Sequence, residues 1–504
     1  MPRPTAVPCS APFSRRDWLA TSALGFGQLA LHALLSDEAR AESPGQSPAN
    51  LPPAGNVAGG DPAGGPAVAT GFRDPLAPRA PHFPATARQV IFLFMHGGVS
   101  HVDTFDPKPR LAELNGQPLP IAKPKFEFAP TGNLLASPWK FQKHGESGLE
   151  ISELFPQLAT RADDLCVLRS MNGGDQVSHG PALLNINTGS GVFARPCLGA
   201  WTLYGLGSDN RNLPGFLSLS PSLYHGGTQN YGSAFLPASF QGTRVGDGGT
   251  PFPQARLAGL VPGDRPDRQR LQLDLLARRN RRHADAVGGD ARLDARIASF
   301  EMAYRMQSQA PVVFDLSQET AGTLARYGVD REPTDEFARQ CLLARRCIEA
   351  GVRFVQVNFS YPRNYWDAHG DLRNNHTSNA AKVDQPIATL LADLRERGLL
   401  DSTLVVFGTE FGRTPAAQGN DGRDHHPHAF SVWLAGGGVR GGIAYGQTDD
   451  FGYYVQENKV TMPDFHATLL HLLGLDHERL TYRHAGRDYR LTDVSGQVID
   501  QILA

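Results

Sequence analysis

The sequence predicts an α/β protein with a doubly wound, mostly parallel sheet and helices on both faces. Three runs are almost continuously apolar, as strands buried on both faces are: "QVIFLFM" from Gln89, "VRFVQVNF" from Val352 and "STLVVFG" from Ser402. Segments with helical periodicity precede the second and the third of these runs. Strands that alternate with helices along the chain are typical of a parallel sheet.

The first strand opens the domain, because the composition changes at Gln89 and the apolar run ends in "HGG", a turn signal. A helix is predicted over "TDEFARQCLLARRCIEAG", where Thr334 is the N-cap and Gly351 the stop. Its apolar residues are Phe337, Cys341, Leu342 and Ile348. The second strand follows this helix at once.

A second helix is predicted over "PIATLLADLRERG", with Pro386 near its first turn and Gly398 at its end. Its apolar residues recur at i, i+3, i+4 and i+7, the spacing of one helix face: Ile387, Leu390, Leu391 and Leu394. The third strand comes next. "FSVWLAGGG" predicts a further strand, and "MPDFHATLLHLLG" a further helix with Pro463 near its start.

The middle of the chain is less regular. Residues 205–290 are rich in Gly, Pro and Arg, and "DARLDARIASFEMAYRMQ" then predicts a helix. There is no internal repeat. We expect one domain over residues 85–504, with a cap inserted over the site at about residues 205–330.

The N-terminus has the features of a twin-arginine export signal. Arg15 and Arg16 precede a moderately apolar run from Trp18 to Leu35, and "ARA" at 39–41 supplies a cleavage site. We expect residues 1–41 to be the signal, and residues 42–84, rich in Pro, Gly and Ala, to be a flexible linker. The mature protein would then work in the periplasm or cell envelope. An ordinary amphipathic helix is the alternative.

Composition excludes two classes of partner. The net charge is −2 and Lys and Arg are spread along the chain, so no basic stripe indicates nucleic acid. No apolar run reaches the ~20 residues of a membrane span, so none should remain after signal cleavage. The cysteines left after cleavage contain no CxxC pair and are expected to be structural: Cys166, Cys197, Cys341 and Cys347. A small or extended polar molecule is the expected partner.

Polar residues follow the predicted strands at the edge where ligands collect in a doubly wound sheet. Each alone is more often a solvated or capping loop residue, but four loops carry them together. Oxygen and nitrogen donors of this kind favour a divalent metal, which could be Zn, Mn, Fe, Mg or Ca. The candidate residues are His96, His101, Asp103, Asp106, Asp367, His369, Glu410, Arg413, Asp424, His425, His426 and His428.

Several motifs carry a family resemblance. "LLADLRERGLLDSTLVVFGTEFG" and "DFHATLLHLLGLD" resemble segments of the alkaline phosphatase and sulfatase superfamily. More closely, "HGGVSHVDTFDPKP", "LGAWTLYGLGSDN" and "GRDHHPHAFSVWLAGGGVRGG" resemble the exported bacterial family of unknown function DUF1501. The resemblance covers about residues 85–503. It implies a doubly wound fold, one or two divalent metals at the strand ends, and hydrolysis of phosphate or sulfate esters.

Residue by residue, the resemblance implies one metal site with Asp367, His369 and one histidine of the "DHHPH" segment. His96 and Glu410 would contribute to a second site. We expect Asp424, His425 and His426 to turn inward beside Glu410, and His428 to be the spare histidine. Substrate contacts are expected from Asp103, Arg413, Arg423 and Asp424, with surface ion pairs as the alternative for the two arginines.

The chain also departs from the superfamily pattern. "MHGG" stands where an Asp-Gly pair is usual, and "TEFG" replaces "SDHG". The stretch matching the nucleophile is "QVSHGPALLNINTG", which nominates Ser178 or His179; a water activated by a metal is the other possibility. A helix-capping Ser178 beside a buried His179 is the structural alternative. The C/S-x-P-x-R pattern of formylglycine sulfatases is missing from the sequence, which disfavours standard sulfatase chemistry.

The leading hypothesis is an exported metal-dependent hydrolase of phosphate, sulfate or related esters. Its substrate would be an anionic small molecule or a polysaccharide ester. The alternative is a non-catalytic envelope or polysaccharide-binding protein that keeps the hydrolase fold. Fold alone cannot separate the two, because unrelated functions share one scaffold.

Overall fold

The computed structural model describes residues 74–504, except 123–128, 258–259, 261–264 and 287–290. The expected signal and most of the expected linker lie outside the described residues. The chain divides into two units. The first, Met1–Ala67 with Pro262–Gln269, lies almost entirely outside the described part, and the second comprises Val68–Val261 and Arg270–Ala504. Among the described helices, none combines the length and apolar character that crossing a membrane requires.

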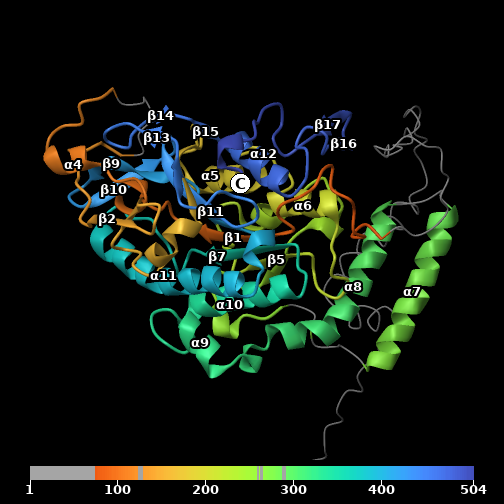
Figure 1. The fold of residues 1–504 in the computed structure, drawn as a ribbon. Helices are drawn as coiled ribbons and strands as arrows, with labels where there is room; N and C mark the ends of the chain where they lie inside the picture. The colour runs from red at the N-terminus through yellow and green to blue at the C-terminus, as the bar shows by residue number, and fades with distance from the viewer. Residues whose placement is uncertain (1–73, 123–128, 258–259, 261–264, 287–290) are drawn as a thin grey trace, which may run out of the picture. The chain divides into compact units, whose positions relative to one another are not determined.

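A nine-stranded sheet forms the centre of the second unit (Figure 1). Its order is β12-β4-β11-β8-β1-β7-β5-β6, with β15 paired to β4. β11 is antiparallel to both of its neighbours, and the other pairs are parallel, so the sheet is mostly parallel as predicted. The strands are β1 (Gln89–Met95), β4 (Leu165–Asn172), β5 (Phe216–Leu219), β6 (Thr243–Val245), β7 (Phe354–Phe359), β8 (Thr403–Gly408), β11 (Phe430–Ala435), β12 (Ile443–Tyr445) and β15 (Val460–Thr461).

Helices cover both faces of the sheet, which confirms the predicted fold class. Successive side chains of β1 point to opposite faces. Ile91, Leu93 and Met95 pack in a core cluster with α10 (Asp335–Glu349) and α11 (Leu372–Glu396). Val90, Phe92 and Phe94 pack in a second cluster with α5 (His179–Thr188), α6 (Leu198–Leu206) and α12 (Met462–Leu472). Because both faces of β1 are covered by helices, its sequence is apolar throughout.

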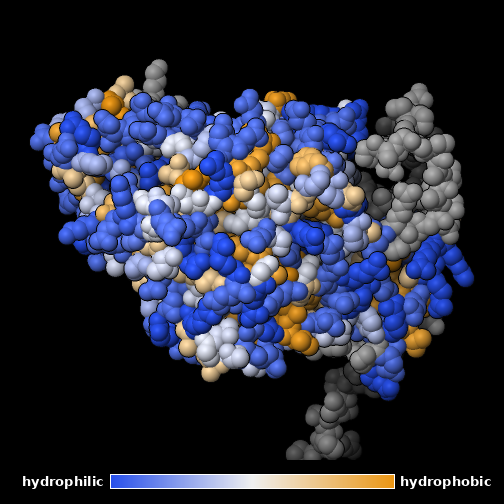
Figure 2. All heavy atoms as spheres, viewed as in Figure 1, coloured by the Kyte–Doolittle hydropathy of each residue, from blue (hydrophilic) through white to orange (hydrophobic). Residues whose placement is uncertain are grey.

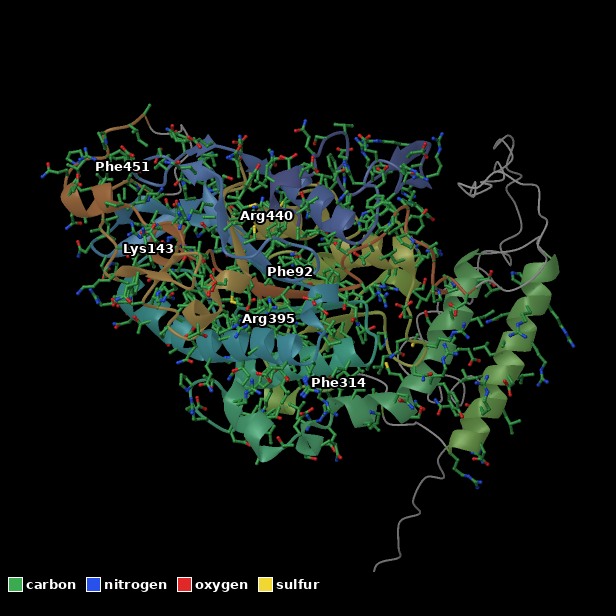
Figure 3. The ribbon with its side chains drawn as sticks, viewed as in Figure 1. Phe92, Lys143, Phe314, Arg395, Arg440 and Phe451 are labelled. Atoms are coloured by element: carbon green, nitrogen blue, oxygen red, sulfur yellow. The ribbon has the colours of Figure 1, made fainter. Side chains whose placement is uncertain are left out.

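Figure 3 labels Phe92 among the strands and Phe451 away from them. Phe451 belongs to a third, smaller core cluster with Val102, Leu111 and Tyr453. The face drawn in Figure 2 is mostly hydrophilic, and its hydrophobic side chains occur in small groups. Most large apolar side chains of the described residues are buried, on the two faces of the sheet.

The structure confirms most of the predicted elements and changes the limits of one. The three apolar runs form β1, β7 and β8, and the helix predicted after Thr334 is α10. α11, however, begins at Leu372, so Pro386 lies inside it and not near its first turn. Its early turns bury His376, Ala380 and Val383, and this burial holds a helix through a polar segment that propensity alone does not predict.

Part of the segment that we expected to form a cap, about residues 205–330, belongs to the central sheet. β5 and β6 fall within it, and both are strands of the central sheet. They are short and flanked by Gly and Pro, so the pattern of apolar residues in the sequence does not reveal them. The rest of the segment contains α7 (Pro266–Ala286), α8 (Ala291–Phe314) and α9 (Ala321–Tyr327). The four cysteines expected to be structural are buried and unpaired.

The N-terminus of α12 gives a stability prediction. Thr461 and Asp464 form a capping box, in which the Thr461 hydroxyl accepts from Asp464 N and an Asp464 oxygen accepts from Thr461 N at 2.9 Å. Thr461→Ala should lower the free energy of unfolding by about 1 kcal/mol. Thr461→Ser, which keeps the hydroxyl, is the matched control in urea unfolding. Equal losses in both variants would show that the cap contributes nothing.

Candidate metal centre

The predicted site residues meet where the parallel strands end. His96 follows β1 directly, Glu410 comes just after β8, and Asp367 lies in the loop between β7 and α11. β1 pairs in parallel with both β7 and β8. The three loops therefore leave the sheet at the same edge, as expected for a doubly wound fold.

Gly97 allows two of these loops to approach each other. Its φ is +117°, and a Cβ there would lie 2.5 Å from Trp366 N and 2.6 Å from Asp367 N, so only glycine fits. The Gly97 N–H donates to Glu410 Oε1 at 2.8 Å, and its carbonyl accepts from Arg413. The "HGG" turn thus fixes how close His96 and Asp367 lie.

The segment that carries Asp424 and His425 is a hairpin and not a loop. β9 (Gly412–Gln418) pairs antiparallel with β10 (Gly422–His426), with an irregularity between Arg423 and His425. A Cβ on Gly422 would lie 2.0 Å from the His369 carbonyl oxygen, so the hairpin sits directly against the Asp367 loop.

α5 adds His179 at its first residue. With it, the described residues form three groups whose donor atoms lie within 4.8 Å of one another. The groups overlap, since His179 belongs to two of them and His425 to two. They are His96, His179 and Glu410; His179, Asp367 and His425; and His369, Asp424 and His425.

His179 is held by hydrogen bonds at both ring nitrogens. Nδ1 lies 2.7 Å from Glu410 Oε1, and Nε2 lies 2.8 Å from the Tyr365 hydroxyl and 3.6 Å from Asp367 Oδ2. Burial lowers the pKa of His179, but the bonds to Asp367 and Glu410 outweigh burial and raise that pKa overall. Burial raises the pKa of Glu410, but the hydrogen bond from His179 outweighs burial and lowers that pKa to about 2.

His425 shows that the donor set fits a metal. Its Nδ1 lies 2.7 Å from the Val177 carbonyl oxygen, which can only accept, so Nδ1 carries a proton. In the neutral ring Nε2 then carries a lone pair, and it faces Asp367 Oδ1 at 3.2 Å. Burial lowers the pKa of His425, which favours the neutral ring. A histidine that donates its far nitrogen to a carbonyl and turns the other toward a carboxylate is typical of a metal ligand.

Asp367 is oriented by Arg413. Arg413 is fully buried, lies 2.5 Å from Asp367 Oδ1 through Nη2, and donates to the carbonyls of Gly97 and Gly98. Burial would raise the pKa of Asp367, but its bonds to histidines and the Arg413 charge hold that pKa far below the usual range. Arg413 therefore positions the Asp367 carboxylate through a buried ion pair, whereas we expected either a contact with substrate or an ion pair on the surface.

His369 and Asp424 form the third donor group together with His425. His369 Nε2 lies 3.0 Å from Asp367 Oδ1, its Nδ1 contacts Gln418, and the bond to Asp367 raises the His369 pKa. Asp424 accepts the N–H groups of Ala129 and His425 at 2.9 and 2.8 Å. Its carboxylate is thus tied to the backbone of two segments.

Two residues at the inner end were missed by the sequence analysis. His225 Nδ1 lies 3.0 Å from His96 Nε2, and the Tyr365 hydroxyl contacts His179. Burial lowers the pKa of His96 to about 4. Tyr365 stands two positions before Asp367 and could have been proposed from that spacing. His225 lies in the irregular middle segment with φ of +52°, and no periodicity points to it.

Several predicted residues lie elsewhere. His426 Nε2 donates to the Tyr453 carbonyl at 2.6 Å, and its ring stacks on His101, so the structure does not bring it to the donor groups. Arg423 and Asp103 form a fully buried ion pair and are therefore not placed to contact substrate. Ser178 occupies the N-cap position of α5, but its side chain makes no capping hydrogen bond.

A comparison with family profiles agrees with the DUF1501 resemblance. A family profile described as "Protein of unknown function (DUF1501)" matches residues 87–503. A search of curated proteins found no match. Similar solved structures include the lipoteichoic acid synthase LtaP from Listeria monocytogenes, with 8% identity and TM-score 0.34 over 81% of this chain and 76% of that one. The PsFucS1 sulfatase from Pseudoalteromonas sp. has 13% identity and TM-score 0.33 over 78% and 68%. Alkaline phosphatase from the Antarctic bacterium TAB5 has 10% identity and TM-score 0.30 over 70% and 92%.

Proposed function

The chain belongs to the DUF1501 family, and from that premise we propose that it is an exported metal-dependent hydrolase of phosphate, sulfate or related esters. One observation carries the proposal: three overlapping groups of imidazole and carboxylate donors, contributed by the loops after β1, β7 and β8, by α5 and by β10. The motifs "LLADLRERGLLDSTLVVFGTEFG" and "DFHATLLHLLGLD", which resemble the alkaline phosphatase and sulfatase superfamily, support the reaction class.

A divalent metal held by these donors would polarise an ester oxygen and stabilise charge on the leaving group. The chain's own residues supply the positioning. Arg413 fixes the Asp367 carboxylate, Glu410 fixes the His179 ring, and the Val177 carbonyl fixes the His425 ring. Burial raises the pKa of Tyr365, so its hydroxyl stays protonated and donates a hydrogen bond.

We assign His179 to the metal donor groups and not to attack on the substrate, because it belongs to two of these groups. Ser178 and water are the nucleophiles that this arrangement leaves. The substrate class that we propose is an anionic small molecule or a polysaccharide ester, because a divalent metal at the site would attract an anion.

One observation favours the non-catalytic alternative, a polysaccharide-binding envelope protein. The two arginines of the β9–β10 hairpin are buried. Arg413 pairs with Asp367, and Arg423 pairs with Asp103. A substrate anion would therefore find neither guanidinium free, and hydrolysis would depend on the metal and on backbone donors.

Metal analysis of the purified mature protein, combined with a screen of aryl phosphates, aryl sulfates and sulfated polysaccharides, tests the proposal. An enzyme should lose hydrolysis on chelation and regain it with one of the candidate metals. Metal without turnover of any ester would support the binding protein. A protein without bound metal would contradict the metal-dependent hydrolase.

Export by the twin-arginine route is part of the proposal and gives its own prediction. Replacing Arg15 and Arg16 by Lys should leave the precursor in the cytoplasm, because the export receptor distinguishes the guanidinium pair from simple positive charge. Arg3→Lys, outside the pair, is the matched control. Cell fractionation and immunoblotting measure the outcome, and unchanged export of the paired variant would exclude this route.

A further inference from the structure

The hydrogen bonds of the site separate the nitrogens that carry a proton from those that carry a lone pair. A backbone N–H can only donate and a carbonyl can only accept, so each histidine beside such a group has an assignable proton position. His96 and His425 can be assigned in this way, and the Glu410 carboxylate, which accepts, then assigns the Nδ1 proton of His179.

His96 is not arranged as a ligand. The Tyr361 backbone N–H donates to its Nδ1 at 3.3 Å, so the proton of the neutral ring is on Nε2. Nε2 points at His225 Nδ1, 3.0 Å away, and lies 3.9 Å from Glu410 Oε1. In this tautomer Nε2 cannot bind a metal, and the other tautomer would place the ring proton on Nδ1, where it would face the Tyr361 N–H.

Glu410 is also occupied. Its Oε1 accepts from Gly97 N at 2.8 Å and from His179 Nδ1 at 2.7 Å, and its Oε2 accepts from the Thr409 hydroxyl at 3.2 Å. It is 1% exposed. Glu410 thus does for His179 what the Val177 carbonyl does for His425: it accepts the proton of one ring nitrogen and turns the other toward Asp367.

His179 Nε2 and His425 Nε2 consequently face the same carboxylate. They lie 3.6 Å from Asp367 Oδ2 and 3.2 Å from Asp367 Oδ1, respectively. Lone pairs that face a carboxylate repel it, and a metal ion between them would remove this repulsion. The Tyr365 hydroxyl donates to the same nitrogen of His179 and would compete with the metal for it.

We propose that the site holds one metal ion and not two, bound by His179, His425 and Asp367, with Glu410 outside its coordination as the residue that positions His179. The inference rests on the proposed function, because it specifies the metal of the same site. Two imidazoles and one carboxylate suit Zn²⁺ or Fe²⁺ and leave further positions for substrate. His96 then serves to hold His225, whose ring lies at the edge of the site.

Metal stoichiometry in the mature protein decides the question. Wild type, Glu410→Gln and His96→Gln should each bind one metal ion per chain by mass spectrometry. Glu410→Gln keeps an acceptor oxygen for His179, and His96→Gln removes no ligand of the proposed ion. Two ions in wild type and one in Glu410→Gln would overturn the inference and leave the proposed function standing. No metal in wild type would overturn both.

The positioning role of Glu410 has a separate measurement. Glu410→Ala should weaken metal affinity by about 10- to 100-fold, and Glu410→Gln should restore most of it. Melting curves in chelator show whether either variant fails to fold. Electron paramagnetic resonance of the Co²⁺-loaded protein should show an isolated ion; a spin-coupled pair would contradict the inference. Equal affinity in wild type and in folded Glu410→Ala would also contradict it.

Discussion

Replacing Arg423 by methionine should lower the free energy of unfolding by about 3–5 kcal/mol, because it leaves a buried carboxylate without its partner. Arg423 and Asp103 have no exposed side-chain surface, and Nε lies 2.7 Å and Nη2 3.1 Å from the two carboxylate oxygens. Asp103→Asn should cost less than the arginine replacement, since the amide keeps one acceptor.

The double replacement tests whether the loss comes from the unpaired charge. Arg423→Met with Asp103→Leu removes both charges and should recover part of the stability. Recovery will be incomplete, because Arg423 also donates to the carbonyls of Leu135, Thr414 and Pro415. Urea unfolding of wild type, Arg423→Met, Asp103→Leu and the double variant gives the coupling energy. A loss below about 1 kcal/mol for Arg423→Met would show that water reaches the carboxylate.

The same pair should set an acid limit on stability. Burial raises the pKa of Asp103, but Arg423 outweighs it and the pKa is lowered overall. A lowered folded pKa means that the stabilisation is present above the ordinary carboxyl pKa of about 4 and is lost as pH falls through the folded value. The Arg423→Met variant lacks this stabilisation. Protonation of Asp103 should therefore not lower the unfolding free energy of the variant as the pH falls.

The sheet was predictable because its central strands are buried on both faces. β1, β7 and β8 read as apolar runs, and the loops after them carry most of the donor residues. β5 and β6 were not predictable, since they are short and lie in a segment rich in Gly and Pro. Parallel order then places β5 beside β7 through pairing of residues that are far apart in the sequence.

The donor groups were predictable as a set but not residue by residue. His425 and His426 are neighbours in β10, and neighbouring side chains of a strand point to opposite faces, so one turns to Asp367 and the other to Tyr453. Recognising "GRDHH" as a strand would have excluded one of the two histidines. The partners of Arg413 and Arg423 depend on contacts between distant segments, which no local pattern reveals.

Loss of a metal ligand should be the largest functional effect. We expect His425→Ala and Asp367→Ala each to lose bound metal and the hydrolysis that depends on it. His428→Ala, a histidine of the same segment outside the donor groups, is the matched control and should keep both. A metal that binds only the folded state stabilises it by about 2.7 kcal/mol when its free concentration is a hundred times the Kd.

Chelation separates the metal from the rest of the structure. Wild type and His428→Ala should melt at a lower temperature in chelator, whereas His425→Ala and Asp367→Ala should melt at the same temperature with and without it. Asp367→Ala should also be less stable than wild type when both are chelated, because it leaves Arg413 buried without its carboxylate. If chelator lowered the melting temperature of all four proteins equally, the metal would bind elsewhere, and the hairpin formed by β9 and β10 would have only a structural role.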